Sequence, residues 1–96
     1  MIAFVATLTI KPEARGSFEK AQVELRNLTY KHEPNTPFYE LLKSRDDPNT
    51  YLVVATFKDQ AAFDFHMKTE FHDRLVPPIL AALGKEMDLK FYDLIL

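Results

Sequence analysis

Two kinds of apolar repeat alternate along this chain, and their order restricts the possible folds most strongly. Residues 2–10 alternate large apolar side chains with smaller or hydroxylated ones, as a β-strand requires. Residues 13–31 carry apolar side chains three and four positions apart, which is typical of an amphipathic helix. Strand-like patterns return in residues 38–45, 51–57 and 87–96. The chain is therefore expected to combine strands and helices in one fold.

A second helical segment lies between the last two predicted strands. Asp59 is a suitable N-cap for a first helix, and Thr69 is suitable for a second. Pro77 and Pro78 are predicted to kink or restart this second helix, because proline lacks the N–H that an interior helical position donates. Gly84 is predicted to form the C-terminal cap.

The predicted order is β-α-β-β-α-β, which is the ferredoxin-like α+β plan: an antiparallel sheet with helices on one face. At 96 residues, the chain is expected to form one domain over residues 1–96. Its strands are apolar on both faces, with Val5 and Val54 among the residues of the second face. A sheet face that no helix covers is normally polar. We therefore expect a second copy of the chain to cover it, giving a homodimer.

The composition excludes several classes of function. The net charge is −2 and the pI is about 5.9, so no basic surface for nucleic acid is expected. The chain has no cysteine, which excludes disulfides and thiolate chemistry. No apolar run reaches the roughly 18 residues of a membrane helix, and the first residues lack the positive charge of a signal peptide. A cytoplasmic protein without nucleic-acid or membrane partners is expected.

His66 is the strongest chemical lead in the sequence. It shares one helical stripe with Ala62, Phe63 and Met67, which should face the core. Histidine has a pKa of about 6.5 and is the side chain best suited to accept a proton near neutral pH. An apolar surround would also disfavour the charged imidazolium. His66 is therefore a candidate general base. The alternative is a structural histidine that bonds to a backbone carbonyl or to Tyr39.

The other two histidines carry weaker signals. His72 borders the next apolar stripe, and we interpret it mainly as a structural residue. On one helix, its side chain would point about 240° away from that of His66. A metal site with Glu70 or Asp73 would match no known ligand spacing, so no metal is expected. His32 is explained by the favourable interaction of a cation with a helix C-terminus.

Six short motifs occur together over nearly the whole chain. They are Leu8-Thr-Ile-Lys-Pro12, His32-Glu-Pro34, Tyr39-Glu-Leu-Leu42, Ser44-Arg-Asp-Asp-Pro-Asn49, Ala61-Ala-Phe-Asp-Phe-His66 and Thr69-Glu-Phe-His72. As a set they resemble the antibiotic biosynthesis monooxygenase (ABM) family. The resemblance implies a dimeric α+β barrel and, for a quinol-monooxygenase-like member, oxidation of quinols or anthrones by dioxygen without a cofactor. Other members of the family degrade heme or isomerise small sugar-like phosphates.

Two departures from the family's patterns narrow this expectation. Heme-degrading members carry a tryptophan on the helix and an iron-ligating histidine. Here those positions look like His66 and Val76, and the chain has no tryptophan. Neither heme nor any other cofactor is therefore expected. Many quinol-type members also carry a glutamate near the end of the third strand, where this chain has Ala55. That loss favours a barrel without catalytic activity.

These considerations assign the catalytic role to His66, acting with dioxygen on a quinol, anthrone or similar phenolic molecule. The substrate pocket is expected beside this histidine. The residues predicted to bind the substrate are Phe4, Tyr39, Phe63, Met67, Phe71, His72 and Leu75. Two alternatives remain open. One is a non-catalytic dimeric barrel that binds a small apolar ligand or is purely structural, and the other is an isomerase of the same family.

Overall fold

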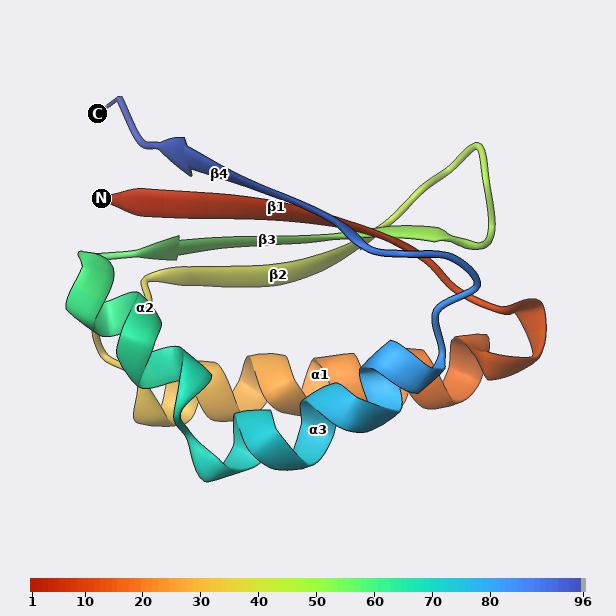
Figure 1. Ribbon diagram of the computed structural model, residues 1–96, viewed down its shortest axis with the longest axis horizontal. Coiled ribbons are helices and arrows are strands. Elements are labelled where there is room, and N and C mark those ends of the chain that lie inside the picture. The colour runs from red at the N-terminus through yellow and green to blue at the C-terminus, as the bar shows by residue number, and fades with distance from the viewer. Residues whose placement is uncertain (96) are drawn as a thin grey trace.

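Four strands and three helices make up the part of the chain that the computed structural model describes, residues 1–95. The strands are β1 (Ile2–Thr9), β2 (Phe38–Lys43), β3 (Thr50–Phe57) and β4 (Asp88–Asp93). The helices are α1 (Arg15–His32), α2 (Gln60–Met67) and α3 (Glu70–Ala81), and a 3-10 turn, η1 (Pro12–Ala14), precedes α1. The strands form one antiparallel sheet in the order β2-β3-β1-β4 (Figure 1). This arrangement confirms the predicted ferredoxin-like α+β class.

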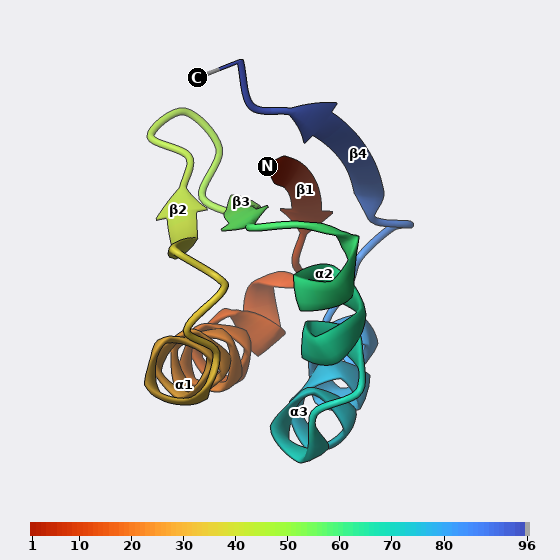
Figure 2. The same cartoon turned by 90° about the vertical axis from the view of Figure 1, so that its left-hand side faces the viewer.

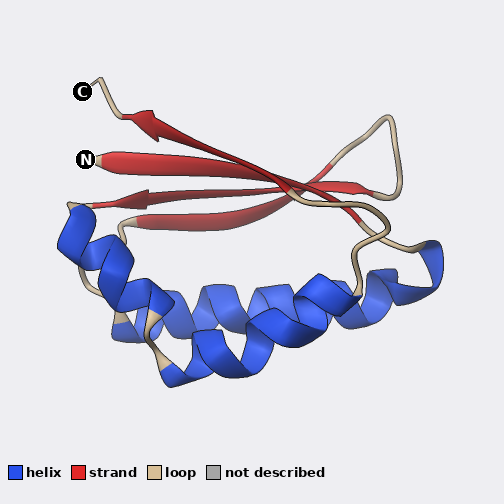
Figure 3. Cartoon of the chain, viewed as in Figure 1, coloured by secondary structure: helices blue, strands red, loops and turns tan. Residues whose placement is uncertain are grey.

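The three helices lie on the same face of the sheet (Figures 2 and 3). Because side chains alternate between the two faces of a strand, every second residue of β1 and β3 is buried beneath the helices. These residues are Phe4, Ala6 and Leu8 of β1 and Tyr51, Val53, Ala55 and Phe57 of β3. The core therefore lies between the sheet and the helices.

The other face of the sheet carries apolar side chains among polar ones. Val5 and Val54 pair across β1 and β3 on this face, where both are only partly buried. Leu42 of β2 and Tyr92 of β4 lie toward its two edges and are 47% and 51% exposed. No described helix covers this face (Figure 2).

Local capping signals place the starts of α2 and α3. The Oδ1 atom of Asp59 accepts a hydrogen bond from the backbone N–H of Ala62 (2.9 Å). The Oγ1 atom of Thr69 accepts one from the backbone N–H of His72 (3.2 Å). Each bond satisfies an N–H that the first turn of a helix leaves without a partner. Both predicted N-caps are confirmed.

The predicted restart of the helix at Pro77 and Pro78 is wrong, because α3 continues through both residues. Each proline removes one helical hydrogen bond, but both lie on the exposed side of the helix, where water can reach the freed carbonyls. Leu75 and Ile79, one turn apart, are buried on the opposite side and hold this turn of the helix in the core.

None of the described helices is long and apolar enough to cross a membrane.

The predicted role of Gly84 is also wrong. The helix ends at Ala81 with Ala82 as its C-cap, and no described glycine has a positive φ. Gly84 instead donates its backbone N–H to the carbonyl of Thr9 (2.7 Å), beside a β-bridge between Ile10 and Leu83. The contact ties the end of α3 to the end of β1, which makes a left-handed cap unnecessary.

Candidate functional site

A cavity of about 280 Å³ lies between the sheet and the helices. It is lined by Phe4, Ala6, Leu8, Gln22, Leu25, Tyr39, Val53, Phe63, His66, Met67, His72, Val76, Ile79, Leu80, Met87 and Leu89. Four of these side chains are polar, and none is a lysine, arginine or carboxylate. The cavity therefore suits a small apolar molecule with few polar groups.

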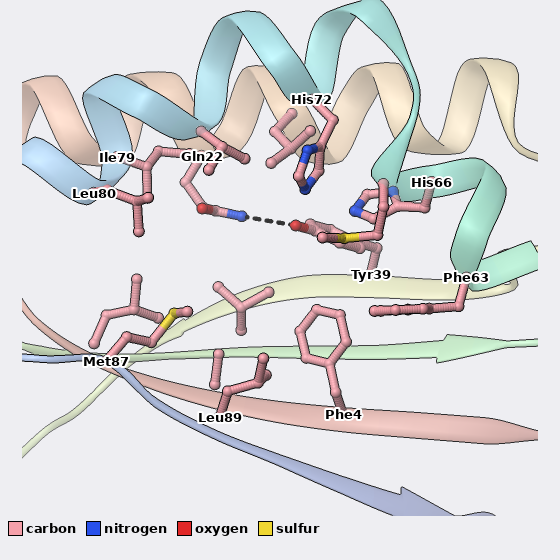
Figure 4. A pocket seen from close by; sticks show the side chains of 16 residues that line it. Phe4, Gln22, Tyr39, Phe63, His66, His72, Ile79, Leu80, Met87 and Leu89 are labelled. Carbon is pink, nitrogen blue, oxygen red and sulfur yellow. Dashed lines mark hydrogen bonds between the residues drawn. The ribbon is translucent and has the colours of Figure 1, made fainter. Parts of the chain in front are cut away.

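The polar side chains gather at one part of the cavity (Figure 4). The rings of His66 and His72 are 4.9 Å apart between centroids, and those of His66 and Tyr39 are 5.3 Å apart. Leu80 and Met87 lie at the other end in Figure 4. A bound molecule would thus meet hydrogen-bonding groups at one end and apolar surface at the other.

His66 is held by a carboxylate that the sequence analysis did not identify. Its Nδ1 atom lies 2.8 Å from Oε2 and 3.1 Å from Oε1 of Glu33, and the two residues are 2% and 3% exposed. The Oγ1 atom of Thr36 also donates to Oε1 of Glu33 (3.0 Å). The apolar surround expected for His66 is therefore corrected, since an acidic group lies in direct contact with its ring.

The contact with Glu33 determines what the other ring nitrogen of His66 can do. A carboxylate accepts a hydrogen bond, so Nδ1 carries the proton and donates it to Glu33. Nε2 of the neutral ring then keeps a lone pair. Because His66 lines the cavity and Glu33 does not, the edge of the ring that bears Nε2 is the one available to a bound molecule.

Tyr39 and Gln22 form a second buried polar pair. The Nε2 atom of Gln22 donates to the hydroxyl oxygen of Tyr39 (3.3 Å), as the dashed line in Figure 4 marks. Gln22 is 2% exposed and Tyr39 is 4% exposed. Burial raises the pKa of Tyr39 to about 12. Its hydroxyl therefore remains protonated over the physiological pH range.

His72 completes the polar part of the cavity and makes stability depend on pH. Burial, and secondarily the neighbouring His66, lower the pKa of His72 below its usual 6.5. The unfolded chain therefore binds a proton at this residue more readily than the folded protein does, so acidification through about pH 6.5 should destabilise the fold.

Replacing His72 by glutamine should reduce the drop in melting temperature between about pH 7 and about pH 5, because it removes this titrating group. Thermal unfolding followed by circular dichroism measures the effect. His32→Gln is the matched control, since His32 is exposed at the end of α1. An equal drop for His72→Gln and the parent protein would contradict the assignment.

The structure brings together most of the residues predicted for the site. Phe4, Tyr39, Phe63, Met67 and His72 all line the cavity together with His66.

Phe71 and Leu75 do not line this cavity. They are buried in the core, and the ring of Phe71 stacks on that of His32, with centroids 5.9 Å apart.

Ala55 is fully buried opposite Tyr39 in the neighbouring strand. Within the described residues, no group of three or more potential ligands could hold a metal ion.

The sequence analysis missed Glu33 and Gln22. Gln22 lies on the buried row of α1, four residues after Phe18 and three before Leu25. A polar residue at this spacing on an otherwise apolar row is the available signal. Glu33 follows the last residue of α1 and gave no periodic signal at all. The contact of Glu33 with His66 spans 33 positions of sequence.

Fold and site together define a small α+β protein with a buried histidine–carboxylate pair beside an apolar cavity. A model of the antibiotic biosynthesis monooxygenase family matches residues 1–77. The Bacillus subtilis (strain 168) protein Putative monooxygenase YcnE is 31% identical over 87 residues, which cover 91% of this chain and 85% of that protein. The chain therefore belongs to the ABM family, whose general monooxygenase-like function it shares.

Solved structures agree with this assignment. One described as an antibiotic biosynthesis monooxygenase is 32% identical, with a TM-score of 0.90 and 99% of both chains covered. An ABM-type protein from Caulobacter crescentus CB15 is 22% identical, with a TM-score of 0.94 over 98% of this chain and 89% of that one. At 22% identity, the similarity to the Caulobacter crescentus protein supports the fold alone.

Proposed function

We propose that this protein is a cofactor-independent monooxygenase of a quinol, anthrone or similar phenolic molecule. The observation that carries the proposal is the buried pair of His66 and Glu33 at the edge of an apolar cavity. A histidine whose Nδ1 donates to a carboxylate presents Nε2 as a proton acceptor, and such a positioned base is the protein group that this chemistry requires.

The reaction would begin with proton transfer from the phenolic hydroxyl, or its tautomeric C–H, to Nε2 of His66. The resulting anion is electron-rich, and one of its ring carbons that bears hydrogen forms a C–O bond with dioxygen. The imidazolium returns the proton to the terminal oxygen, giving a hydroperoxide. Loss of the remaining hydrogen from that carbon, with cleavage of the O–O bond, yields a carbonyl and one water. The substrate supplies all the electrons that reduce dioxygen.

The cavity supports this class of substrate. Its volume and its mainly apolar lining suit a compact aromatic ring system. No lysine or arginine is among the described residues that line it, so it offers no permanently charged partner for a phosphate or carboxylate group. This feature favours phenolic substrates over the sugar-like phosphates of isomerases.

Oxygen uptake by the purified protein tests the proposed function. The panel comprises hydroquinones, naphthohydroquinones and anthrones, assayed without an added cofactor and corrected for autoxidation. We expect uptake to rise in proportion to protein for at least one member, with one atom of ¹⁸O₂ in the organic product. If no member of the panel is consumed faster than without protein, the chain functions as a binding or structural barrel.

We further propose that two copies of the chain pair through the helix-free face of the sheet. Val5, Leu52 and Val54 lie on this face, and Tyr92 extends it onto β4. Apolar area of this kind is removed from water when two copies associate, which stabilises the dimer by roughly 25 cal/mol for each Å² buried.

Replacing Val54 by lysine should convert the dimer to a monomer, because a charge would be buried without a partner in the interface. The monomer itself should tolerate the change, since Val54 is only partly buried and lies on the face that no described helix covers (Figure 2). Light scattering at micromolar concentration measures the mass, and one chain weighs 11.1 kDa. Val23→Lys is the control, as Val23 is exposed on α1. A monomeric parent protein would refute the pairing.

A further inference from the structure

The hydroxyl group of Tyr39 accepts a hydrogen bond but donates none to the described residues. Its oxygen accepts the side-chain N–H of Gln22, and no described residue accepts its own proton. A buried hydroxyl without an acceptor is costly, and Tyr39 is 4% exposed. The side chain lines the cavity, so a bound molecule is the acceptor that would satisfy it.

The surroundings of Tyr39 hold this hydroxyl in place. Its backbone N–H donates to the hydroxyl of Tyr30 (2.9 Å), which anchors this end of β2 to α1. From another position on α1, Gln22 reaches the hydroxyl of Tyr39. Because the amide of Gln22 donates, it occupies a lone pair of the tyrosine oxygen and leaves the O–H free to donate elsewhere.

The free donor of Tyr39 lies beside the candidate base. The rings of Tyr39 and His66 are 5.3 Å apart between centroids, and both line the same cavity (Figure 4). We propose that Tyr39 donates a hydrogen bond to the phenolic oxygen that His66 deprotonates, and that Gln22 positions Tyr39 for this contact. The inference rests on the proposed function, and it specifies that the site binds its substrate as a phenolate.

The chemistry of the two groups is complementary. When Nε2 of His66 takes the proton, negative charge develops on the phenolic oxygen. A hydrogen bond to a charged acceptor is stronger than one to a neutral acceptor, so Tyr39 favours the ionised form over the neutral one. Such a donor, fixed in advance and shielded from water, is an effective means of stabilising developing charge. The pair therefore selects molecules with an acidic hydroxyl at one end and an apolar remainder.

The binding of 4-nitrophenol tests this role without any oxygen chemistry. Its neutral and ionised forms absorb at different wavelengths, so the spectrum of the bound molecule reports its ionisation. In a buffer acidic enough to keep free 4-nitrophenol mostly neutral, the parent protein should bind it mainly as the phenolate. Tyr39→Phe should lower the ratio of ionised to neutral bound ligand by about 10- to 100-fold, as expected for a lost hydrogen bond to a charged group.

Two substitutions at Gln22 distinguish positioning from simple packing. Gln22→Leu should lower the ratio less than Tyr39→Phe, because the tyrosine donor remains but is no longer held. Gln22→Glu keeps the shape, but its carboxylate would accept the proton of Tyr39, so this variant should lose at least as much as Tyr39→Phe. Tyr92→Phe, which removes a hydroxyl from the other face of the sheet, is the control. Melting temperatures establish that each variant is folded.

The outcomes separate this inference from the proposed function. If the parent binds 4-nitrophenol only in its neutral form, or if Tyr39→Phe leaves the ratio unchanged, the role of Tyr39 is refuted even where oxygen uptake is normal. An unchanged ratio in Gln22→Glu would refute the positioning role of Gln22. If the ratio falls as expected while the parent protein consumes no oxygen, the phenolate site stands and the oxygenation does not.

Discussion

Replacing His66 by glutamine is expected to lower the rate of oxygen uptake by about 10²- to 10⁴-fold, the usual contribution of a positioned general base. The amide N–H of glutamine can still donate to Glu33, so the buried carboxylate keeps a partner. An amide cannot accept a proton near neutral pH, however, and the phenolic hydroxyl would then have to ionise unaided. Initial rates with the best substrate of the panel, measured for the parent and variant proteins at equal concentration, give the ratio.

His32→Gln is the matched control for this experiment. His32 is exposed at the end of α1, where its ring stacks on Phe71 outside the cavity. The control should retain the parent rate. If His66→Gln also retains it, the proton is taken by another group or lost directly to solvent. His66 would then be a structural histidine that satisfies Glu33.

Replacing Glu33 by alanine should lower the free energy of unfolding by about 1–3 kcal/mol, the usual cost of leaving a buried hydrogen-bond donor without its acceptor. The substitution leaves the Nδ1–H of His66 without an acceptor. It also removes the acceptor of the Thr36 hydroxyl. Domains of this kind have total stabilities of about 5–15 kcal/mol, so the variant should remain folded at room temperature but unfold at a lower urea concentration than the parent. Urea denaturation followed by circular dichroism measures the change.

The control for this prediction is Glu24→Ala. Glu24 also forms an ion pair, with Arg74 at 2.9 Å, but both side chains are nearly half exposed. Exposed pairs contribute little because water solvates each partner well, so this variant should unfold almost like the parent. Equal losses in the two variants would mean that the burial of Glu33 adds nothing to the strength of its contact with His66.

Much of the fold was predictable because its signals are local. The alternation of buried and less buried side chains in β1 and β3 arises only because successive side chains of a strand point to opposite faces. The caps at Asp59 and Thr69 depend on residues three positions apart. The wrong predictions came from local rules whose effect is smaller than that of packing in the folded protein. Pro77 and Pro78 break a helix in isolation, but the buried contacts of the same turn of α3 outweigh their cost.

The site was predictable only in part. His66 was found because a polar residue on an apolar helical stripe is visible in the sequence itself. Met67 and Phe63 followed from the same stripe, and both line the cavity. Phe71 and Leu75 were predicted on equal grounds, yet they pack in the core. Helical periodicity shows which side of a helix is buried, but it does not distinguish the core from a cavity.

The sequence by itself determined the order of the elements, the presence of apolar side chains on both faces of the sheet and the position of the buried histidine. Tertiary structure decided what that histidine can do. Its acceptor, Glu33, lies 33 positions earlier in the chain, just beyond the end of α1. The hydroxyl of Tyr39 acquires its role from Gln22 across 17 positions. Such contacts depend on the relative placement of helix and strand, which arises when the apolar faces of both are buried together.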